Sequence, residues 1–505
     1  MSEAPATPMH PIRGRALHWA VTAASCQAFL LLGYDQGVMS GLIGADNEFG
    51  KQFNHPDAGL QGTLTSIYDI GCAVGCLFAF FCGHRVGRRR MIMAGGTIMI
   101  VGTVILGSSY SVAQFIVGRI VTGVGNGINS STVPAYQSEM ALSKHRGRLL
   151  SAQGTVTIVG LCIAYWMDYG LSFVQSPIQW RLPISFQSFF AICLVLQMIP
   201  LPETPRWLCE QDRREDAVKV LTRLQPDAGA PGAAQRLRQS LLEIETAIAI
   251  ESAGGPFHYR ELFTRGKIQN LRRMILCGLV NVQQQFTGAN MINYYAPIVY
   301  QNVMHLSRNT SLILGGCTAI VYLIGSFIPL WSMDRIGRRL SLMVSAAGLS
   351  FCFVMVSILL SVGTQPCAYA ATSFVFIFQL FLGIGYLPVP WFYPSEVTTT
   401  RIRARGQAFA GFVNWMCVFI VVQITPIAIS NIDWRTFIIF ACLCASWIPM
   451  VYFFFPETSG LELEDVDHLF ENGGITGGVF ESRGRPVRPG CHRRQALNIP
   501  LKHPV

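Results

Sequence analysis

The chain has 505 residues, of which 51% are hydrophobic and only 13% charged, about half the charged fraction of roughly 25% that is usual in soluble domains. A soluble protein of this length would need more charge to cover its surface. The net charge of +10 does not indicate binding to nucleic acid, because the basic residues lie in short loops between apolar runs. No catalytic triad, phosphate-binding loop or metal-ligand spacing is evident, so we expect no enzyme activity, cofactor or metal site.

The apolar runs predict an all-α integral membrane protein with twelve transmembrane helices, each needing about 20 residues. In chain order, the predicted spans lie near residues 18–43, 61–82, 91–109, 113–138, 149–168, 181–201, 273–302, 309–331, 340–361, 368–394, 407–428 and 435–455. Two pseudo-symmetric six-helix bundles are therefore expected at 18–201 and 273–455, with tails at 1–17 and 456–505.

The loops predict the orientation in the membrane. Arginine clusters that include Arg88, Arg146, Arg338 and Arg401 all follow even-numbered spans, and the loops after odd-numbered spans are poor in basic residues. Positive loops stay in the cytoplasm, so we expect both termini there, together with the polar linker at 202–272. Within the linker we expect helices near 212–224 and 234–251, acting either as a clasp or gate for the bundles or as a tether.

Three short motifs occur once in each half. GHRVGRRR at 83–90 returns as MDRIGRR at 333–339, and the SEM motif that begins at 138 returns as SEV at 395. The PET motif after the sixth span also returns after the twelfth. Similar offsets in the same order indicate that a six-helix unit was duplicated.

The repeated motifs combine acidic and basic residues at the cytoplasmic helix ends. Glu139 and Arg146 are seven residues apart, as are Glu396 and Arg403. We predict ion-pair latches that hold neighbouring helices and break during a transport cycle; the alternative is that the arginines only set the topology. The predicted latch residues are Arg85, Arg89, Glu139, Arg146, Glu203, Arg206, Asp334, Arg335, Arg339, Glu396, Arg403 and Glu457.

From about residue 18 to 470, the chain resembles the sugar porter family of the major facilitator superfamily. The resemblance rests on PETPRW after the sixth span, QQFTGANMINYY in the seventh and PET after the twelfth. LLGYDQGVMSG and YWMDYG are most similar to a fungal subgroup with proton-coupled glycerol, polyol and sugar transporters. The resemblance implies alternating access around a site near the middle of the bilayer, with a monosaccharide or polyol as solute.

Asp35 lies well inside the first apolar run, where a charged side chain is costly and is by default a functional candidate. A buried carboxylate can take up and release a proton. The resemblance places Arg119 of the fourth span near it. We therefore predict a proton-coupling switch in which Asp35 alternates between a proton and Arg119; the alternative is a permanent ion pair between the two spans.

The seventh span supplies three amides, Gln284, Gln285 and Asn290, which can donate to and accept from a solute with many hydroxyls. Local unwinding at Gly288 would bring Gln285 and Asn290 together. The resemblance assigns the three amides to solute contact; the alternative is that they join helices to one another.

Further candidates lie in the seventh, tenth and eleventh spans. The resemblance adds Trp391 and Asn414 to the solute site. Two prolines break the tenth span, where missing backbone hydrogen bonds allow a hinge. The predicted gating residues are Tyr294, Tyr295, Pro388 and Pro390.

Two positions depart from the family pattern. Many sugar porters carry a glutamine where this chain has Gly154, and Gln153 stands one residue earlier. We include Gln153 among the candidate solute contacts, but one helical step rotates its side chain by about 100°, which weakens a claim of hexose selectivity. His84 stands where the family usually has an aspartate, so we expect the latch of the N-terminal half to be weaker or pH-sensitive.

These features predict a secondary active transporter for a monosaccharide or polyol, such as a hexose, pentose or glycerol, with proton symport. The alternatives are a facilitative sugar uniporter, a nutrient sensor and a transporter of a specialised metabolite. The expected partners are the small polar solute, the proton and the lipid bilayer. We expect a monomeric functional unit in the plasma membrane.

Overall fold

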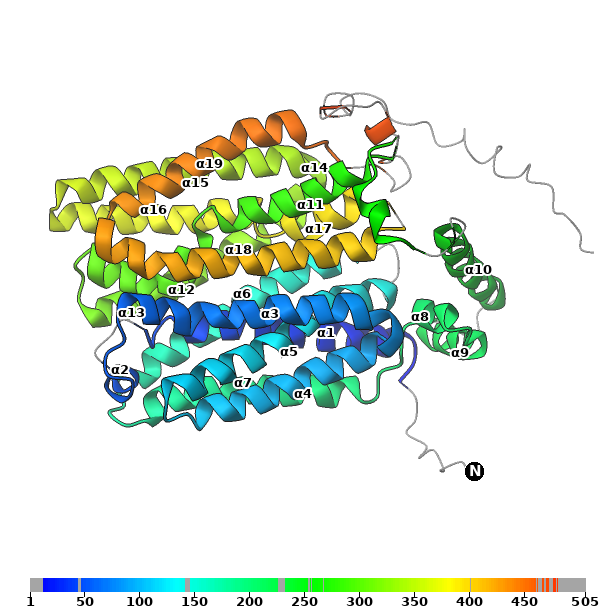
Figure 1. Cartoon of the computed structure of the whole chain (residues 1–505), viewed down its shortest axis with the longest axis horizontal. Coiled ribbons are helices and arrows are strands. Elements are labelled where there is room, and N and C mark those ends of the chain that lie inside the picture. Colours follow the sequence, from blue (N-terminus) through cyan, green and yellow to red (C-terminus); the bar gives the residue numbers. More distant parts are fainter. Residues whose placement is uncertain are drawn as a thin grey trace, which may run out of the picture.

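In the computed structural model of the chain, the described part is helical and contains no strand. The helices run along one common direction in two groups, α1–α7 and α11–α19 (Figure 1). The predicted tails lie mostly outside the described residues, which are 12–43, 47–140, 146–225, 232–252, 255, 257–266, 268–399, 401–459, 461, 466, 469–471, 476–477 and 479.

The first group contains six long helices and a short one. In chain order they are α1 (Gly14–Val38), α2 (Glu48–Gln52), α3 (Ala58–Val86), α4 (Arg88–Gly107), α5 (Val112–Met140), α6 (Arg146–Leu171) and α7 (Ile178–Met198). The short α2 lies in the loop after α1, where Asn47 caps it by accepting a hydrogen bond from the backbone N–H of Gly50 at 2.8 Å.

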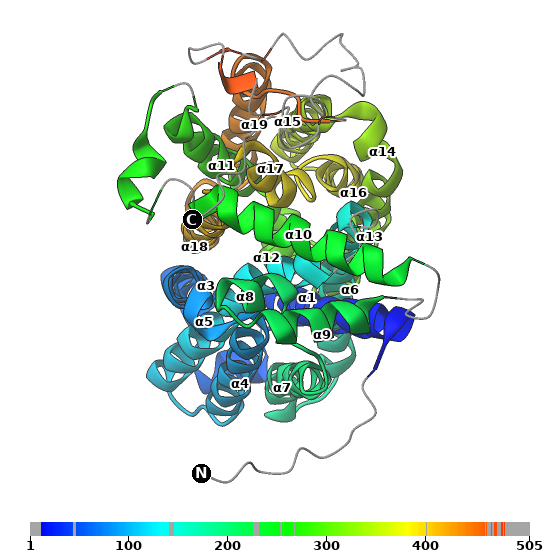
Figure 2. The same ribbon diagram turned by 90° about the vertical axis from the view of Figure 1, so that its right-hand side faces the viewer.

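The linker forms helices at one end of the bundle, which we call the linker end (Figure 1). They are α8 (Pro205–Glu210), α9 (Arg214–Leu224), α10 (Ala233–Ser252) and the 3-10 turn η2 (Tyr259–Phe263). The two linker helices expected near 212–224 and 234–251 are thereby confirmed. Figure 2 views the molecule from the linker end and shows α10 crossing between the two groups.

The second group has several interrupted helices. In chain order it contains α11 (Asn270–Gln285), α12 (Ala289–Ile298), the π-helical turn η3 (Val299–Val303), α13 (Arg308–Phe327), α14 (Pro329–Ile336), α15 (Arg338–Val362), α16 (Gln365–Ile384), α17 (Val389–Val397), α18 (Arg403–Ile432) and α19 (Arg435–Phe454). The predicted spans near 273–302 and 368–394 thus each consist of consecutive shorter helices.

Ten helical segments of the described residues are long and apolar enough to cross a membrane. They include α13 with α14 as one segment and α16 with α17 as another. The helix α5 and the broken pair α11–α12 are not among the ten, yet both lie within the bundle (Figure 1). Both carry buried polar side chains such as Arg119 and Gln284, which lower their apolar character.

Glycines allow α3 and α5 to pack with their backbones in close contact. A Cβ atom at Gly75 of α3 would lie 2.3 Å from the carbonyl oxygen of Val124, and one at Gly127 of α5 would lie 2.0 Å from the carbonyl oxygen of Cys72. Small residues at such positions are typical of membrane helix pairs, where van der Waals packing drives association. This pairing makes the first group a rigid support for the polar residues on α3 and α5.

The repeated motifs adopt the same backbone conformation in both halves. Gly87 precedes α4 with φ 94° and ψ 156°, and Gly337 precedes α15 with φ 90° and ψ 165°. The Glu203 carboxylate accepts the backbone N–H of Arg89 at 3.0 Å. In the same way, Glu457 accepts the backbone N–H of Arg339 at 3.0 Å. Each carboxylate thus caps a helix N-terminus, and the two halves share a scaffold as well as motifs.

At the end opposite the linker, hydrogen bonds join the two groups. Gln423 of α18 donates to the carbonyl oxygen of Gly59 at 3.2 Å and accepts from the hydroxyl of Ser66 at 2.7 Å. Tyr165 of α6 donates to the carbonyl oxygen of Asn293 at 2.8 Å. These contacts close the bundle at the end away from the linker.

Candidate functional site

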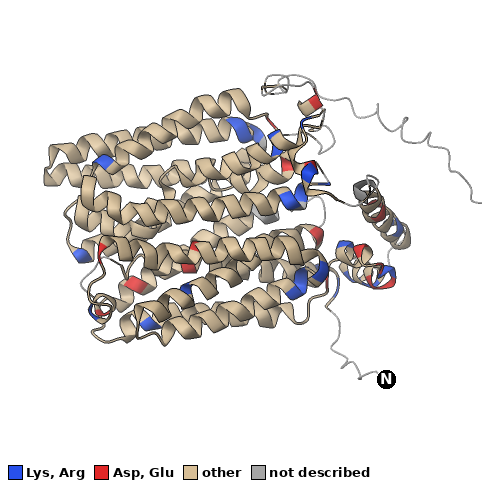
Figure 3. Ribbon diagram, viewed as in Figure 1, with Lys and Arg blue, Asp and Glu red and all other residues tan. Residues whose placement is uncertain are grey.

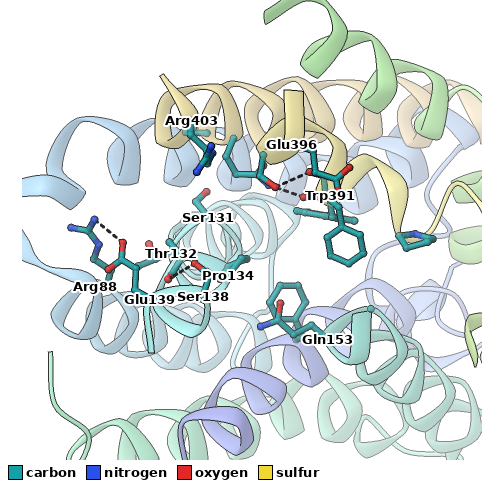
Figure 4. A pocket seen from close by; sticks show the side chains of 18 of the residues that line it. Arg88, Ser131, Thr132, Pro134, Ser138, Glu139, Gln153, Trp391, Glu396 and Arg403 are labelled. Atoms are coloured by element: carbon teal, nitrogen blue, oxygen red, sulfur yellow. Dashed lines mark hydrogen bonds and ion pairs between the residues drawn. The ribbon is translucent and has the colours of Figure 1, made fainter. Parts of the chain in front are cut away.

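A cavity of about 1550 Å³ lies between the two groups. It extends from the amides of α11 and α12 to the linker end, where residues of α10 also line it. Figure 4 shows its polar wall near the linker end, where Glu139 and Ser138 of α5 face the side of α17 and α18 that carries Glu396 and Arg403. The cavity therefore connects the middle of the bundle with the linker end.

Four amides meet at the inner end of the cavity. Nε2 of Gln285 donates to Oδ1 of Asn414 at 2.6 Å, and Nδ2 of Asn290 donates to Oε1 of Gln285 at 2.6 Å. Nε2 of Gln284 donates to the carbonyl oxygen of Tyr386 at 2.6 Å. All four amides line the cavity, so the structure brings together the polar residues predicted from the seventh and eleventh spans.

The break between α11 and α12 makes this meeting possible. Gly288 adopts φ +81°, a left-handed conformation that glycine accepts without strain. A Cβ atom there would lie 2.9 Å from the rings of Phe353 and Phe440, so the position also lacks space for a side chain. The unwinding expected at Gly288 is present, and it places Gln285 and Asn290 within hydrogen-bond distance although they are five residues apart.

A second break lies between α16 and α17. Here the backbone N–H of Val389 donates to the carbonyl oxygen of Gly385 at 3.1 Å, and Pro388 and Pro390 have no N–H to offer. Trp391 at the start of α17 lines the cavity together with Pro388, whereas Pro390 is buried. The carbonyl oxygen of Tyr386, freed at this break, is the one that accepts from Gln284.

Gln153 and Gly154 both line the cavity. Gln153 is buried and forms a hydrogen bond with Gln137 of α5, so its one-residue offset does not remove it from the wall. A Cβ atom added at Gly154 would have a side-chain carbon of Leu387, 3.9 Å away, as its nearest neighbour. The departure at Gly154 therefore leaves free space in the cavity.

The two predicted gating tyrosines occupy different surroundings. Both are buried in α12, and Tyr295 donates from its hydroxyl to the carbonyl oxygen of Val422 at 3.0 Å, which ties α12 to α18. Tyr294 lies instead within electrostatic reach of two buried acidic residues of the first group, Asp69 and Asp35.

Asp35 and Arg119 form a fully buried ion pair, with Nη1 of Arg119 3.0 Å from Oδ1 of Asp35. Nη2 of Arg119 donates to the carbonyl oxygen of Thr65 at 3.0 Å, and its guanidinium lies 4.6 Å from the ring centre of Tyr68. The pairing implied by the resemblance is thus present in this structure, at a depth where charge is rare unless it is compensated.

Asp69 of α3 is a second buried carboxylate within electrostatic reach of Arg119 and Asp35. It was not among the candidates from the sequence. It lies inside the predicted span at 61–82, so a search for charges within apolar runs, which selected Asp35, could have found Asp69 as well.

In each half, an arginine and a glutamate of the repeated motifs form an ion pair. Arg88 contacts Glu139 at 3.0 Å, and Arg338 contacts Glu396 at 2.9 Å. Neither arginine was among the predicted latch residues. The spacing-based partners were Arg146, whose side chain lies outside the described residues, and Arg403, which lines the cavity.

The remaining latch candidates are distributed around these pairs. Arg206 contacts Glu210 at 3.2 Å, and Nε of Arg89 donates to the carbonyl oxygen of Met198 at 3.1 Å. Nη1 of Arg339 donates to the carbonyl oxygen of Val479 at 3.0 Å. Arg85 and Arg335 are exposed, and the side chain of Asp334 lies outside the described residues. His84 is exposed, with Nδ1 3.4 Å from a carboxylate oxygen of Glu210.

The apolar helices, the two groups and the cavity between them define an integral, multi-pass membrane transporter. The chain belongs to the sugar transporter family of the major facilitator superfamily, since the family model described as "Sugar (and other) transporter" matches residues 19–470. It is a transporter and not an enzyme.

Two fungal relatives are similar over most of the chain. The chain is 36% identical to the sugar transporter STL1 of Saccharomyces cerevisiae, covering 95% of this chain and 85% of that protein. It is 37% identical to the MFS-type transporter oryC of Aspergillus oryzae, covering 92% and 87%.

Solved structures with the same fold are also known. The proton:xylose symporter XylE bound to 6-bromo-6-deoxy-D-glucose matches with a TM-score of 0.75 at 21% identity, covering 90% of this chain and 99% of that one. An inward-open structure of the xylose transporter XylE from E. coli matches with a TM-score of 0.72. At this identity, the likeness supports the fold alone.

Proposed function

We propose that this sugar transporter moves a monosaccharide or polyol by alternating access and couples its movement to symport of a proton. Two observations carry the proposal: a cavity lined by amides between the two groups, and a fully buried ion pair within the first group. The amides of Gln284, Gln285, Asn290 and Asn414 offer donors and acceptors to hydroxyl groups. The Asp35–Arg119 pair offers a carboxylate that a proton can neutralise.

The relatives support a polyhydroxylated solute. The names of several include sugar transporter, quinate permease and high-affinity glucose transporter, and the solved neighbour XylE is a proton:xylose symporter. Quinate carries a carboxylate as well as hydroxyls, so it belongs in any panel of solutes tested. In this proposal Trp391 and Gln153 complete the wall around the solute, and the breaks at Gly288 and Pro388 allow the gating helices to move.

The charge distribution supports an orientation with the linker end in the cytoplasm. Lys and Arg residues gather at that end, next to the linker and the ends of α3, α4, α17 and α18 (Figure 3). This matches the positive-inside rule. The proposed transporter then has twelve transmembrane spans, both termini in the cytoplasm and a cavity that faces inward. It works as a monomer in the plasma membrane. The motif ion pairs act as latches that rearrange when the cavity opens outward.

Uptake by cells that lack their own carriers tests the proposal. Glucose, xylose, glycerol and quinate are supplied at external pH 5 and pH 7, with and without a protonophore. We expect one of these solutes to accumulate, more at pH 5 than at pH 7, and to cease accumulating with the protonophore. Asp35→Asn should lose accumulation but keep solute exchange.

Other outcomes separate the alternatives. Equilibration that is insensitive to the protonophore and unchanged by Asp35→Asn would identify a facilitative uniporter. Failure of all four solutes to enter, with the protein shown at the cell surface, would contradict the solute class and favour a sensor or a carrier of another metabolite.

A further inference from the structure

Asp69 is fully buried on α3, at the middle of the bundle. Neither oxygen of its carboxylate accepts a hydrogen bond from any residue that the structure describes. The position is surrounded by helices, since α3 packs against α5 within its own group and against α18 of the other. A carboxylate so placed is shielded from bulk solvent and has no donor among the described residues, so a negative charge on it is disfavoured.

The nearby arginine is already engaged. Arg119 contacts Oδ1 of Asp35 at 3.0 Å and the carbonyl oxygen of Thr65 at 3.0 Å. Thr65 and Asp69 are four residues apart on α3 and so share one helix face. The guanidinium also lies 4.6 Å from the ring centre of Tyr68. Arg119 is therefore held beside Asp69 while its charge is paired with Asp35.

The buried charges do not balance if both acids are ionised. Asp35 and Asp69 would then carry two negative charges against the one positive charge of Arg119. A buried charge without a partner is strongly disfavoured, so the group of three must hold one proton. With Arg119 on Asp35, that proton belongs on Asp69.

The other groups facing Asp69 come from the surrounding helices. Tyr68 and Cys72 lie beside it on α3, Asp35 approaches from α1, and Tyr294 and Tyr295 approach from α12. Among the described groups that act electrostatically on Asp69, Arg119 is the basic one.

Tyr294 links Asp69 to the other half of the molecule. Its hydroxyl is buried and has no hydrogen-bond partner among the described residues, and it lies close to Asp69. Tyr294 follows the amide of Asn290 by one turn of α12, the helix that begins at the break beside the cavity. A change in the protonation of Asp69 would therefore take place next to α12, the helix that carries Asn290.

We propose that Asp69 is a second proton-binding residue, and that it and Asp35 share Arg119 so that the guanidinium determines which carboxylate keeps the proton. In the conformation described, Arg119 pairs with Asp35 and the proton is on Asp69. A shift of Arg119 toward Asp69 pairs that carboxylate and leaves the proton to Asp35, or releases it to water when the cavity reaches the acid. In this step the guanidinium shifts and one proton passes from the Asp69 carboxyl to the Asp35 carboxylate. The net charge of the three groups stays constant until the proton leaves for water.

This inference rests on the proposed proton symport, and liposomes containing purified protein test both. The solute is whichever of glucose, xylose, glycerol and quinate the wild type carries. A trapped pH dye reports solute-driven proton movement, and labelled solute reports exchange without a gradient. We expect Asp69→Asn to lose proton movement while exchange continues. Asp57→Asn, the same change at the exposed start of α3, should behave like the wild type.

The outcomes separate the two ideas. A wild type that carries solute without moving protons would overturn the symport and this inference together. A wild type that moves protons and an Asp69→Asn variant that does so equally well would overturn only the role of Asp69.

A second measurement covers the case in which Asp69→Asn does not fold. The infrared spectrum of the wild type should contain the C=O stretch of a protonated, buried carboxyl group. Asp69→Glu keeps the carboxyl but changes its surroundings, so one such band should shift in this variant. Bands that are identical in wild type and Asp69→Glu would overturn the inference.

Discussion

At the scale of single residues, the amides at the inner end of the cavity act as one unit. Gln285 donates to Asn414 and accepts from Asn290, so each amide orients the next. An amide can exchange such a bond for one to a solute hydroxyl without leaving a buried polar group unsatisfied. As the proposed solute site, the amides are therefore already organised in the absence of a solute, and they can exchange partners when one binds.

Asn290→Ala should raise the apparent KM for uptake. The change removes a donor that a solute hydroxyl would use, and one such hydrogen bond is typically worth about 0.5–1.5 kcal/mol, equivalent to a roughly 2- to 13-fold weaker affinity. Uptake kinetics at equal surface expression measure it. Gln239→Ala, an exposed amide of the linker, is the control. A KM equal to that of the wild type would show that Asn290 does not contact solute.

A second residue-scale prediction concerns the tie between the linker and the second group. The hydrogen bond from Arg401, at 2.6 Å, lowers the pKa of Glu261 to about 2. A lowered carboxyl pKa means that the contact is fully present above the ordinary value of about 4.3 and is lost only as pH falls through about 2. Between pH 5 and pH 8 the tie should therefore not change.

Limited proteolysis of the segment 257–266 checks this. We expect equal cleavage rates at pH 5 and pH 8 for the wild type and faster cleavage at both values for Arg401→Gln. Arg213→Gln removes an exposed linker pair with Asp216 and serves as the matched control. A wild-type cleavage rate that rises at pH 5 would contradict the low pKa of Glu261.

Many residues of the site could be predicted from the sequence. The residues that could not be predicted depend on how separate helices pack against one another. Asp35 and the amides stand out because polar groups are rare in apolar runs. Arg88 was missed as the partner of Glu139 because the two residues are 51 apart in the chain and lie on different helices, α4 and α5. The spacing of seven to Arg146 measures only distance along the chain. The orientation of Gln153 likewise depended on how α6 is rotated, which its own sequence leaves open.

At the scale of helices, interruptions distinguish the two halves. The second group has breaks at Gly288, between α13 and α14 and between α16 and α17, whereas the first packs long helices through glycine contacts. The breaks at Gly288 and Pro388 were visible in the sequence from glycine and proline. The break before Pro329 was not expected, although it too has proline at its first position.

Gly288→Ala should destabilise the protein and impair transport. Alanine at φ +81° is strained, and its Cβ atom would meet Phe353 and Phe440 at 2.9 Å. We expect a cost of about 1 kcal/mol or more, seen as a lower Tm of the purified protein in detergent. Gly170→Ala, where a Cβ atom meets nothing within 4 Å, should leave the Tm unchanged. Equal Tm values for both variants would show that the break tolerates a side chain.

At the scale of the whole molecule, the two ends of the bundle differ. Hydrogen bonds from Gln423 and Tyr165 join the groups opposite the linker, while the cavity extends toward the linker end. With the linker end in the cytoplasm, as we propose, this asymmetry is what an inward-facing state of an alternating-access carrier requires. The duplication was readable from the motifs, but the state of the cavity was not, because one sequence must be compatible with every state of the cycle.

Gln423→Ala should shift the population toward the outward-open state. The variant loses the contacts with Gly59, Thr63 and Ser66 of α3 that join the two groups at the far end in this structure. We expect a cysteine placed at Gln36, which lines the cavity, to react faster with an impermeant thiol reagent added opposite the linker in the Gln423→Ala background. Ser430→Ala, an exposed change on the same helix, is the control. Unchanged labelling would mean that the Gln423 contacts do not hold the far end closed.

The size of the cavity has a kinetic consequence. At about 1550 Å³ it exceeds the roughly 300–1,000 Å³ of most small-molecule pockets, so entry from the linker side rejects few molecules by size. In the proposed transport cycle, discrimination then falls to the closure of α12 and α17 around the occupant. A bulky glycoside of the transported solute should therefore enter, bind and stall the carrier. Added on the linker side, it should inhibit efflux competitively although it never crosses the membrane.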